Sequence, residues 1–405
     1  MVTRDIETER NIIVDESDLQ AIDQLNDDQR NAYEQILNAV TRNTSTSFFV
    51  DGPGGTGKTF LYRALLAKIR SVGGIALATA TSGIAASILP GGRTAHSRFK
   101  IPLYDDDSKS CHVGKQTTIA QLIRDAKLII WDEASMAKRK SIERFDEMMR
   151  DITSRDLLFG GKTVVFEGDF RQTLPVVTKG NKEDIISASL VMSPIWQQLT
   201  KLRLKENMRV RSNKNFSNFL LRIGDGTEIS NYMNEIKIPA PINLPFVHDT
   251  SSVETLVNMV FPDMETFNSD LSSIVNRAIL MRRNDFVHEI NDMLINKFPS
   301  PQKTYLSFDE ALDTSHQLEN QDFLNTLTPK GLPSHELKLK KNCPVMLIQN
   351  INPTEELSNG TRLICKEFEN NVIQADISFA AYTVRNEYAQ KGENFEQNEQ
   401  FPTEE

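Results

Sequence analysis

The sequence predicts an α/β fold built on a parallel sheet, from three observations. Residues from about 25 to 210 alternate short apolar runs with helix-period stretches, which is the pattern of βαβ units. Two of the runs, 126–133 and 163–169, are apolar at successive positions, as expected for strands buried on both faces. Each run ends in polar residues, and folds of this class bind their ligands at the carboxyl ends of the strands.

The expected elements alternate along the first half of the chain. They are a helix capped by Asn26 or Asp27, a strand at 47–52, a helix at 59–69, strands at 74–80 and 126–133, a helix at 141–152 and a strand at 163–169. Beyond 210 the pattern loosens and suggests a small β-rich unit. Its expected elements are helices at 216–226, 254–261 and 285–298, strands at 277–282, 344–351, 361–368 and 371–378, and a loop-dominated stretch at 300–335.

Composition describes a globular protein of two or three domains. The chain has 405 residues, of which 39% are hydrophobic and 25% charged. No apolar run approaches the roughly 20 residues that span a bilayer, and the acidic N-terminus is unlike a signal or transit peptide. We therefore expect an intracellular protein without a membrane partner. Three cysteines without paired spacing indicate reduced thiols rather than a zinc site or a disulfide framework.

The net charge of −9 argues against a uniformly basic surface but allows a local basic groove. Much of the acid lies at the two ends of the chain. Residues 1–24 hold seven acidic and two basic side chains, and residues 386–405 hold six acidic side chains and one lysine. Both ends are poor in core-forming residues, so we expect 1–24 and 381–405 to be disordered.

The strongest motif is GPGGTGKT, which fits the phosphate-binding loop pattern of glycine, four residues and Gly-Lys-Thr. Glycines let the backbone N–H groups point at phosphate oxygens, and the helix that follows presents its positive end to the same anion. Lys58 is expected to reach the β- and γ-phosphates, and the Thr59 hydroxyl to bind Mg²⁺. The candidate nucleotide-binding residues are Gly52, Pro53, Gly54, Gly55, Thr56, Gly57, Lys58 and Thr59.

An acidic pair follows the apolar run LIIW. Asp132 is suited to hold Mg²⁺ through water, and Glu133 to orient and deprotonate the attacking water. A solvated acidic pair at a strand end is the simpler alternative, but the phosphate loop upstream favours the catalytic interpretation.

Three further polar residues are candidates for the same site. Gln172 follows the third buried strand, where it could sense loss of the γ-phosphate. Arg209, after a predicted strand and turn, could stabilise charge on the transferred phosphoryl group, although a surface arginine is more often simply solvated. The amide of Gln29 could pair with an adenine edge, which by itself is a weak signal.

Taken together, these residues resemble the Pif-type (petite integration frequency) DNA helicases of superfamily 1B. The resemblance runs from about 25 to 368, some 85% of the chain, and is greatest to the plant and mobile-element branch. It is carried by LNDDQ, GPGGTGKT, ATATSGIAA, GGRTAHSRF, WDEASM, FGGKTVVFEGDFRQTLPVV, LKENMR, LLRIGDG, TYLSFDEA, LTPKGLPSHELKLKKNCPVMLIQNINP and NGTRLI.

The resemblance implies two RecA-like domains that couple ATP·Mg²⁺ hydrolysis to 5′→3′ movement on single-stranded DNA and on tailed duplexes. It implies roles in DNA repair, recombination and telomere maintenance, in the nucleus or alternatively in an organelle. By position, the resemblance makes Gln29 the adenine-reading glutamine, and Lys58 and Thr59 the phosphate-loop pair. It makes Asp132 the Mg²⁺ ligand and Glu133 the base. It makes Gln172 the γ-phosphate sensor and Arg209 an arginine finger.

Two family motifs in the same resemblance are placed along DNA. Thr79, Thr81 and Gly83 fall in the first, where small hydroxyls and exposed N–H groups suit phosphate contacts. His96 and Ser97 fall in the second. A capped turn or a core histidine is the alternative for this pair.

The expected organisation is a RecA-like domain at 25–210 and a partial second RecA-like domain with a β-rich unit at 211–380. The family's Ser-Gln-Gly motif and Tyr-Val-Ala-Leu-Ser-Arg motif are not found after NGTRLI. Because the latter would supply a second arginine for the γ-phosphate, we expect ATP·Mg²⁺ binding with impaired unwinding. The alternatives are a weakly catalytic module that binds ATP and single-stranded DNA, and a P-loop ATPase of another type.

Overall fold

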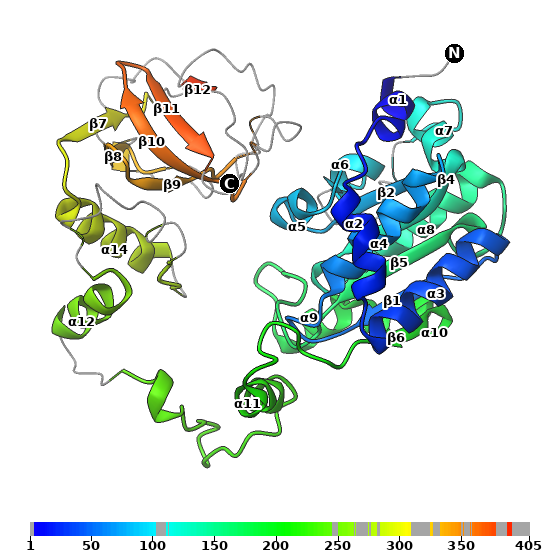
Figure 1. Cartoon of the computed structure of the whole chain (residues 1–405), viewed down its shortest axis with the longest axis horizontal. Coiled ribbons are helices and arrows are strands. Elements are labelled where there is room, and N and C mark those ends of the chain that lie inside the picture. Colours follow the sequence, from blue (N-terminus) through cyan, green and yellow to red (C-terminus); the bar gives the residue numbers. More distant parts are fainter. Residues whose placement is uncertain are drawn as a thin grey trace, which may run out of the picture. The chain divides into compact units, whose positions relative to one another are not determined.

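The chain divides into two units, Met1–Lys237 and Ile238–Glu405, which are described separately. The computed structural model (Figure 1) describes residues 4–102, 111, 113–244, 250–262, 264, 274, 277–281, 284–308, 325–326, 333–349, 351, 357, 359–377 and 387–390.

The first unit is built on a six-stranded sheet with the order β3-β2-β4-β5-β1-β6. Every strand pair in it is parallel. The strands are β1 Phe48–Asp51, β2 Ile75–Ala80, β3 Arg93–Thr94, β4 Ala126–Asp132, β5 Thr163–Gly168 and β6 Thr200–Arg203. The predicted α/β fold with a parallel sheet is therefore confirmed, and β1, β2, β4 and β5 lie where the apolar runs placed them.

Helices cover both faces of this sheet, because successive residues of each buried strand point to opposite sides. Phe49 and Ile129 pack with α7 and α8, whereas Val50 and Ile130 pack with α3 and α4. The α-helices of the unit are α1 Arg4–Arg10, α2 Glu16–Gln20, α3 Asp27–Arg42, α4 Lys58–Ser71, α5 Gly83–Ile88, α6 Ala95–Phe99, α7 Thr118–Asp125, α8 Arg139–Thr153, α9 Lys182–Ala188, α10 Pro194–Gln198 and α11 Lys214–Gly224. Short 3-10 turns lie at Ala21–Gln24, Ala134–Met136, Leu158–Gly161 and Leu190–Met192.

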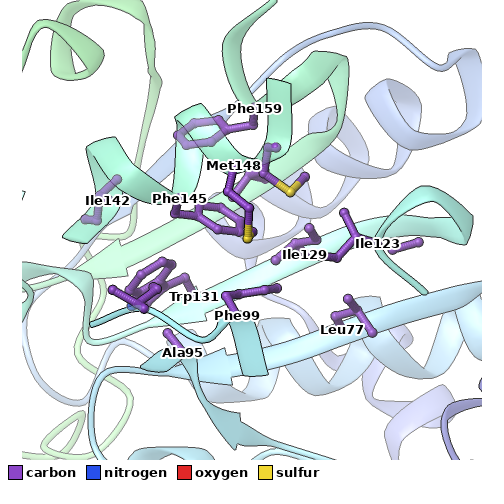
Figure 2. Packing of buried hydrophobic residues seen from close by; sticks show 14 of the residues in the cluster. Leu77, Ala95, Phe99, Ile123, Ile129, Trp131, Ile142, Phe145, Met148 and Phe159 are labelled. Carbon is purple, nitrogen blue, oxygen red and sulfur yellow. The ribbon is translucent and has the colours of Figure 1, made fainter. Parts of the chain in front are cut away.

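Aromatic side chains fill the core on the α8 face of the sheet (Figure 2). Phe145 of α8 lies 5.4 Å from Trp131 and 4.5 Å from Phe99, measured between ring centroids. The Phe159 ring lies 5.6 Å from that of Phe145, and the Phe166 ring lies 5.2 Å from that of Phe159. Trp131 is fully buried one residue before Asp132, so this packing fixes the end of β4.

The expectation that residues 1–24 are disordered is wrong for residues 4–24, which form α1, α2 and a 3-10 turn. Ile6 joins the main core. Glu9 and Arg98 form an ion pair at 2.5 Å, in which both side chains are buried. Counting acids could not reveal this pairing, because the partner of Glu9 lies 89 residues away in sequence.

The first unit also extends past the expected boundary at 210. After β6 the chain continues into α11, where the Asp225 carboxylate at the end of the helix accepts a hydrogen bond from Arg171 Nε at 2.6 Å. This ion pair joins α11 to the segment after β5, and the unit ends at Lys237.

The described residues of the second unit combine helices with antiparallel sheets. The helices are α12 Thr250–Val260 and α14 Asn284–Lys297, with a 3-10 turn at Ala240–Ile242. The strands are β7 Gln302–Leu306 and β8 Glu336–Lys340 in one sheet, and β9 Pro344–Met346, β10 Arg362–Phe368, β11 Val372–Ile377 and β12 Glu387–Gln390 in the other. The predicted helices at 254–261 and 285–298 and the strands at 344–351, 361–368 and 371–378 are confirmed, with shifted ends.

Three expectations for this unit need correction. Residues 277–281 form no strand, and β7 lies inside the stretch expected to be loop. Four residues of the expected disordered tail form β12, which pairs with β11, and the rest of 381–405 lies outside the described residues. In the described part of the chain, no helix is both long and apolar enough to cross a membrane.

The Glu9–Arg98 pair gives a stability test of the N-terminal packing. Replacing Glu9 by alanine leaves the Arg98 charge buried without its partner, so we expect Glu9→Ala to lower the free energy of unfolding by about 3 kcal/mol. The control is Glu7→Ala on the exposed part of the same helix, expected within about 0.5 kcal/mol of wild type. Urea denaturation measures both. If Glu9→Ala were as stable as wild type, the Glu9–Arg98 ion pair would not be what docks α1 on the first unit.

Candidate nucleotide-binding site

The candidate site lies where β4, β5 and β1 end side by side. Asp51 of β1 pairs in register with Gly168 of β5, and Trp131 of β4 pairs with Phe166 of β5. Asp132 and Glu167 therefore end neighbouring strands, and the loop Gly52–Gly57 leaves β1 at the same edge. The sheet itself gathers residues that lie more than 100 positions apart in sequence.

The phosphate loop has the curled backbone that its glycines predict. Gly55 and Gly57 take left-handed conformations with φ of +89° and +77°, which other residues rarely adopt. Inside the curl, Thr56 is buried and donates its hydroxyl to the Pro53 carbonyl at 2.9 Å. A Cβ on Gly52 would lie 2.6 Å from that hydroxyl, so the first glycine is required by space.

Gln29 braces this loop with its side-chain amide. Its side-chain oxygen accepts from the Asn26 N–H at 3.1 Å, in a capping box that starts α3. Its Nε2 donates to the Thr56 carbonyl at 2.9 Å, and the side chain is only 2% exposed. In this structure one N–H and the oxygen of the Gln29 amide hold the loop and the start of α3, and the adenine-reading role stays a prediction.

Lys58, the first residue of α4, folds back over the loop. Its ammonium donates to the Gly52 carbonyl at 2.6 Å and lies 2.9 Å from a carboxylate oxygen of Glu167. Burial lowers the pKa of Lys58, and the negative charges of Asp169, Glu133, Asp132 and Asp51 oppose that shift. The ammonium is thus held among oxygens at the point where the loop could receive a phosphate.

The acidic pair occupies the turn after β4. Asp132 is 7% exposed, and burial, with repulsion from Glu133, raises the pKa of its carboxyl from 3.8 to about 6. The half-buried Glu133 has a left-handed backbone with φ of +53°. Its N–H lies 3.1 Å from both Asp132 Oδ1 and Glu167 Oε2.

A divalent cation fits this chemistry. A desolvated carboxylate such as Asp132 is stabilised by a nearby positive charge, and Mg²⁺ prefers oxygen ligands. Among the described residues, no group of three or more His, Cys, Asp or Glu side chains could hold a metal by itself. Mg²⁺ typically takes one or two protein ligands and completes its shell with water and phosphates. Asp132 and the half-buried Thr59 of α4 are the residues that would hold it.

Gln172 lies next to the phosphate loop. Its Nε2 donates to Asp169 at 3.0 Å and would lie 3.3 Å from a Cβ on Gly54. Although burial acts to raise it, hydrogen bonds from Gln172 and Arg171 hold the pKa of Asp169 below its usual value. Arg171 contacts both Asp169 and Asp225, so these ion pairs connect the segment beside the loop to the end of α11.

The segment after β6 packs directly on the loop. Met208 and Arg209 donate their backbone N–H groups to the Gly55 carbonyl at 2.8 and 3.3 Å. Asn207 donates its side-chain amide to the Gly54 carbonyl at 3.0 Å and accepts the Arg209 N–H at 3.0 Å. Arg209 therefore starts beside the loop with an exposed side chain, within reach of a bound phosphate.

Comparison with known protein families shows to which family the chain belongs. The sequence model described as PIF1-like helicase matches residues 24–234, and the one described as DNA helicase Pif1, 2B domain, matches residues 322–368. The chain belongs to the PIF1-like helicase family. The first match spans the described sheet and the whole candidate site, and the second covers β8, β9 and β10 of the antiparallel unit.

Relatives within the PIF1-like family are distant in sequence. The ATP-dependent DNA helicase PIF1 of Xenopus laevis is 24% identical over 82% of this chain and 46% of its own length. The enzyme named Pif1 from a Psychrobacter species is 25% identical over 78% of this chain and 44% of its own length. The chain thus spans less than half the length of these two curated relatives.

Solved PIF1-family structures share the fold. The Pif1 helicase of Candida albicans matches with a TM-score of 0.59 at 20% identity, over 90% of this chain and 78% of that one. The Pif1 helicase from Bacteroides, solved with ADP-AlF3 and single-stranded DNA, matches with a TM-score of 0.60 at 20% identity, over 94% and 75% of the two chains.

Of the expected DNA-facing residues of this PIF1-like chain, Thr79 is buried and the half-buried Thr81 is hydrogen-bonded to the end of β4. Thr79 is fully buried in β2 and donates its hydroxyl to the Ile130 carbonyl at 2.6 Å, so it cannot contact DNA here. Thr81 donates to the Glu133 carbonyl at 2.7 Å and accepts from the Trp131 indole at 3.1 Å. Both threonines join β2 to the strand that ends in the acidic pair, so their role in the structure is to hold β4.

The remaining expected DNA-facing residues lie nearer the surface. Gly83 is half-buried at the start of α5, after the Ser82 cap. His96 is half-buried in α6, where burial lowers the pKa of its imidazole and favours the neutral ring. Ser97 is exposed, and its N–H lies 3.4 Å from the capping Thr94 hydroxyl. The capped turn named as the alternative for this pair is thus present, and of these three residues Ser97 is the exposed one.

Two residues of the site were not singled out in the sequence. Glu167 reads as one of the residues of an apolar strand, and nothing in its spacing indicates that it meets Lys58. Asn207 lies inside the LKENMR motif, in which only Arg209 was given a predicted role. A polar residue within a buried run is the one signal that could have identified Glu167, because such a side chain needs a partner.

The raised pKa of Asp132 predicts a stability change of known sign. Because the folded state resists ionisation, Asp132 destabilises the fold increasingly as pH rises from about 4 to about 6, and fully above that. We expect Asp132→Asn to be more stable than wild type by about 2 kcal/mol at pH 8 without nucleotide or metal, and by little below pH 4.

Urea denaturation at pH 4 and pH 8 in the presence of a chelator measures this gain. A variant less stable than wild type at pH 8 would show that Asp132 is not a desolvated carboxylate.

Proposed function

We propose that this chain carries the ATP-hydrolysing motor of a DNA helicase that moves 5′→3′ along single-stranded DNA. The observation that carries the proposal is one connected cluster at the sheet edge, in which the Lys58 ammonium contacts Glu167, and Glu167 and Asp132 both contact the Glu133 N–H. The cluster lies against a curled loop of backbone N–H groups. Phosphate, metal and water can therefore be bound within one small volume.

The residues divide the chemistry among themselves. Lys58 and the loop N–H groups would neutralise the triphosphate, and Asp132 with Thr59 would hold Mg²⁺, which draws charge from the β- and γ-phosphates when bound. Glu133 would orient the attacking water and accept its proton. Arg209 would approach the γ-phosphate from the segment after β6, which packs on Gly55. Gln172 would detect the loss of the γ-phosphate and move Asp169, to which it donates a hydrogen bond.

The nucleic-acid partner is proposed from the family. The relatives carry the name ATP-dependent DNA helicase, and one matching structure is that of a Pif1 helicase with single-stranded DNA. We propose single-stranded DNA and 5′-tailed duplexes as substrates, with roles in repair, recombination and telomere maintenance and a nuclear location. Within the motifs expected to face DNA, the exposed Ser97 and the start of α5 are the available contacts.

DNA-stimulated ATPase activity tests the motor. We expect hydrolysis by wild type to rise when a single-stranded oligonucleotide is added. Lys58→Ala is expected to lose Mg·ATP binding, because the ammonium that meets the phosphates is gone. Glu133→Gln is expected to keep ATP binding while turnover falls at least 10²-fold, roughly the contribution of a general base.

Comparison of the three proteins separates the motor from its alternative. If wild type and both variants are equally inactive but still bind DNA, the chain is a binding module for ATP and single-stranded DNA. A strand-displacement assay on 5′-tailed and 3′-tailed duplexes then tests direction, and unwinding of the 3′-tailed duplex alone would contradict the proposed polarity.

A further inference from the structure

A third carboxylate lies inside the proposed ATP site. Glu167 is the last residue but one of β5, and it is only 1% exposed. One of its oxygens lies 2.9 Å from Lys58 Nζ, and the other accepts the Glu133 N–H at 3.1 Å. A single buried side chain thus contacts both the lysine that meets phosphate and the backbone of the proposed general base.

Burial makes these two contacts necessary. A carboxylate in an apolar strand is costly to desolvate unless a charge or hydrogen-bond donors compensate. The neighbours of Glu167 along β5, Phe166 and Val165, are fully buried apolar residues. Lys58, with 12% of its side chain exposed, supplies the compensating charge.

The same ammonium is also needed by the triphosphate. Lys58 carries one charge and three donors. It donates to the Gly52 carbonyl at 2.6 Å and to the Pro53 carbonyl at 3.4 Å, and its Nζ lies 2.9 Å from Glu167 Oε1 as an ion pair. To meet the β- and γ-phosphates it has to leave or share Glu167. Glu167 and the incoming phosphate therefore compete for Lys58, and the carboxylate also repels the phosphate charge.

The second contact persists when the first is exchanged. Glu133 has a left-handed backbone, a strained conformation for a non-glycine residue that needs support from its surroundings. The acceptors at its N–H are Asp132 Oδ1 and Glu167 Oε2. If Asp132 turns toward a metal ion, Glu167 remains as the group that holds the Glu133 backbone in place.

We propose that Glu167 is a positioning residue of the ATP site, which holds Lys58 before nucleotide enters and holds Glu133 during turnover. The inference rests on the proposed ATPase function and adds to it a residue that sets both nucleotide affinity and turnover. Glu167 weakens nucleotide binding, which raises the Kd for Mg·ATP, and it supports the chemical step, which raises kcat. A residue with a merely structural role would not show this combination.

Glu167→Gln is the direct test. The amide has the same shape but no charge, and it can satisfy only one of the two contacts, because its nitrogen cannot accept a hydrogen bond. We expect the Kd for Mg·ATP to fall about tenfold, which corresponds to the loss of roughly 1.4 kcal/mol of competition and repulsion. When Lys58 moves to the phosphates, the amide oxygen can still accept the Glu133 N–H, so we expect kcat of Glu167→Gln to stay within about threefold of wild type. Glu167→Leu, which removes both contacts, should lower kcat about tenfold.

Asp51→Asn is the matched control. It removes the same charge from the end of the adjacent strand β1, where Asp51 lies 3.7 Å from Arg171 and 3.9 Å from Arg203. The Asp51 charge is the weakest of the four that oppose the lowered pKa of Lys58, and its side chain is 29% exposed and therefore screened by solvent. We expect Asp51→Asn to change the Kd by less than about twofold. Equal tightening by both variants would mean that net charge, and not the Glu167 contact, sets the affinity.

Isothermal titration with Mg·ATP and steady-state ATPase assays give the two constants, and thermal melting checks folding. If Glu167→Gln does not fold, Glu167→Asp, whose shorter side chain withdraws from Lys58, should bind Mg·ATP about threefold more tightly. Unchanged or weaker binding by a folded variant would overturn the inference. Failure of wild type to bind Mg·ATP would instead overturn the proposed function.

Discussion

Burial of the central strands on both faces confines the chemistry of this domain to one edge of its sheet. β4 and β5 are covered by α7 and α8 on one side and by α3 and α4 on the other, so a polar side chain within them has no access to water. Polar residues can be tolerated only where the strands end. Because the strands are parallel, those ends coincide, and Lys58, Asp132 and Glu167 meet there.

The phosphate loop is preorganised by residues that perform no chemistry. Gln29 holds it from α3, through the Thr56 carbonyl, and Asn207 holds it from the segment after β6, through the Gly54 carbonyl. Both attachments reach carbonyl groups of the loop and so do not occupy its N–H groups. A loop fixed in this way loses little further entropy when a triphosphate binds, so more of the contact energy remains as affinity.

The sequence predicted the parts of this structure that follow from local patterns. The parallel sheet, the phosphate loop and the Asp132–Glu133 turn each have a signal within a dozen residues, and all lie at the predicted positions. It failed where a residue's partner is remote. The helix α1 depends on Arg98, and the burial of Thr79 depends on the β4 backbone. A side chain's hydroxyl or amide indicates what it can bind, but only the fold decides which partner it meets.

The central claim is that Lys58, the loop and the acidic turn bind a magnesium-bound triphosphate. Isothermal titration of the purified chain with ATP, with Mg²⁺ and then with a chelator in its place, tests this most directly. We expect saturable one-to-one binding that weakens at least tenfold when Mg²⁺ is withdrawn, because the charges of Asp132 and Glu167 then repel the phosphates. Absence of binding, or equal binding with and without the metal ion, would contradict it.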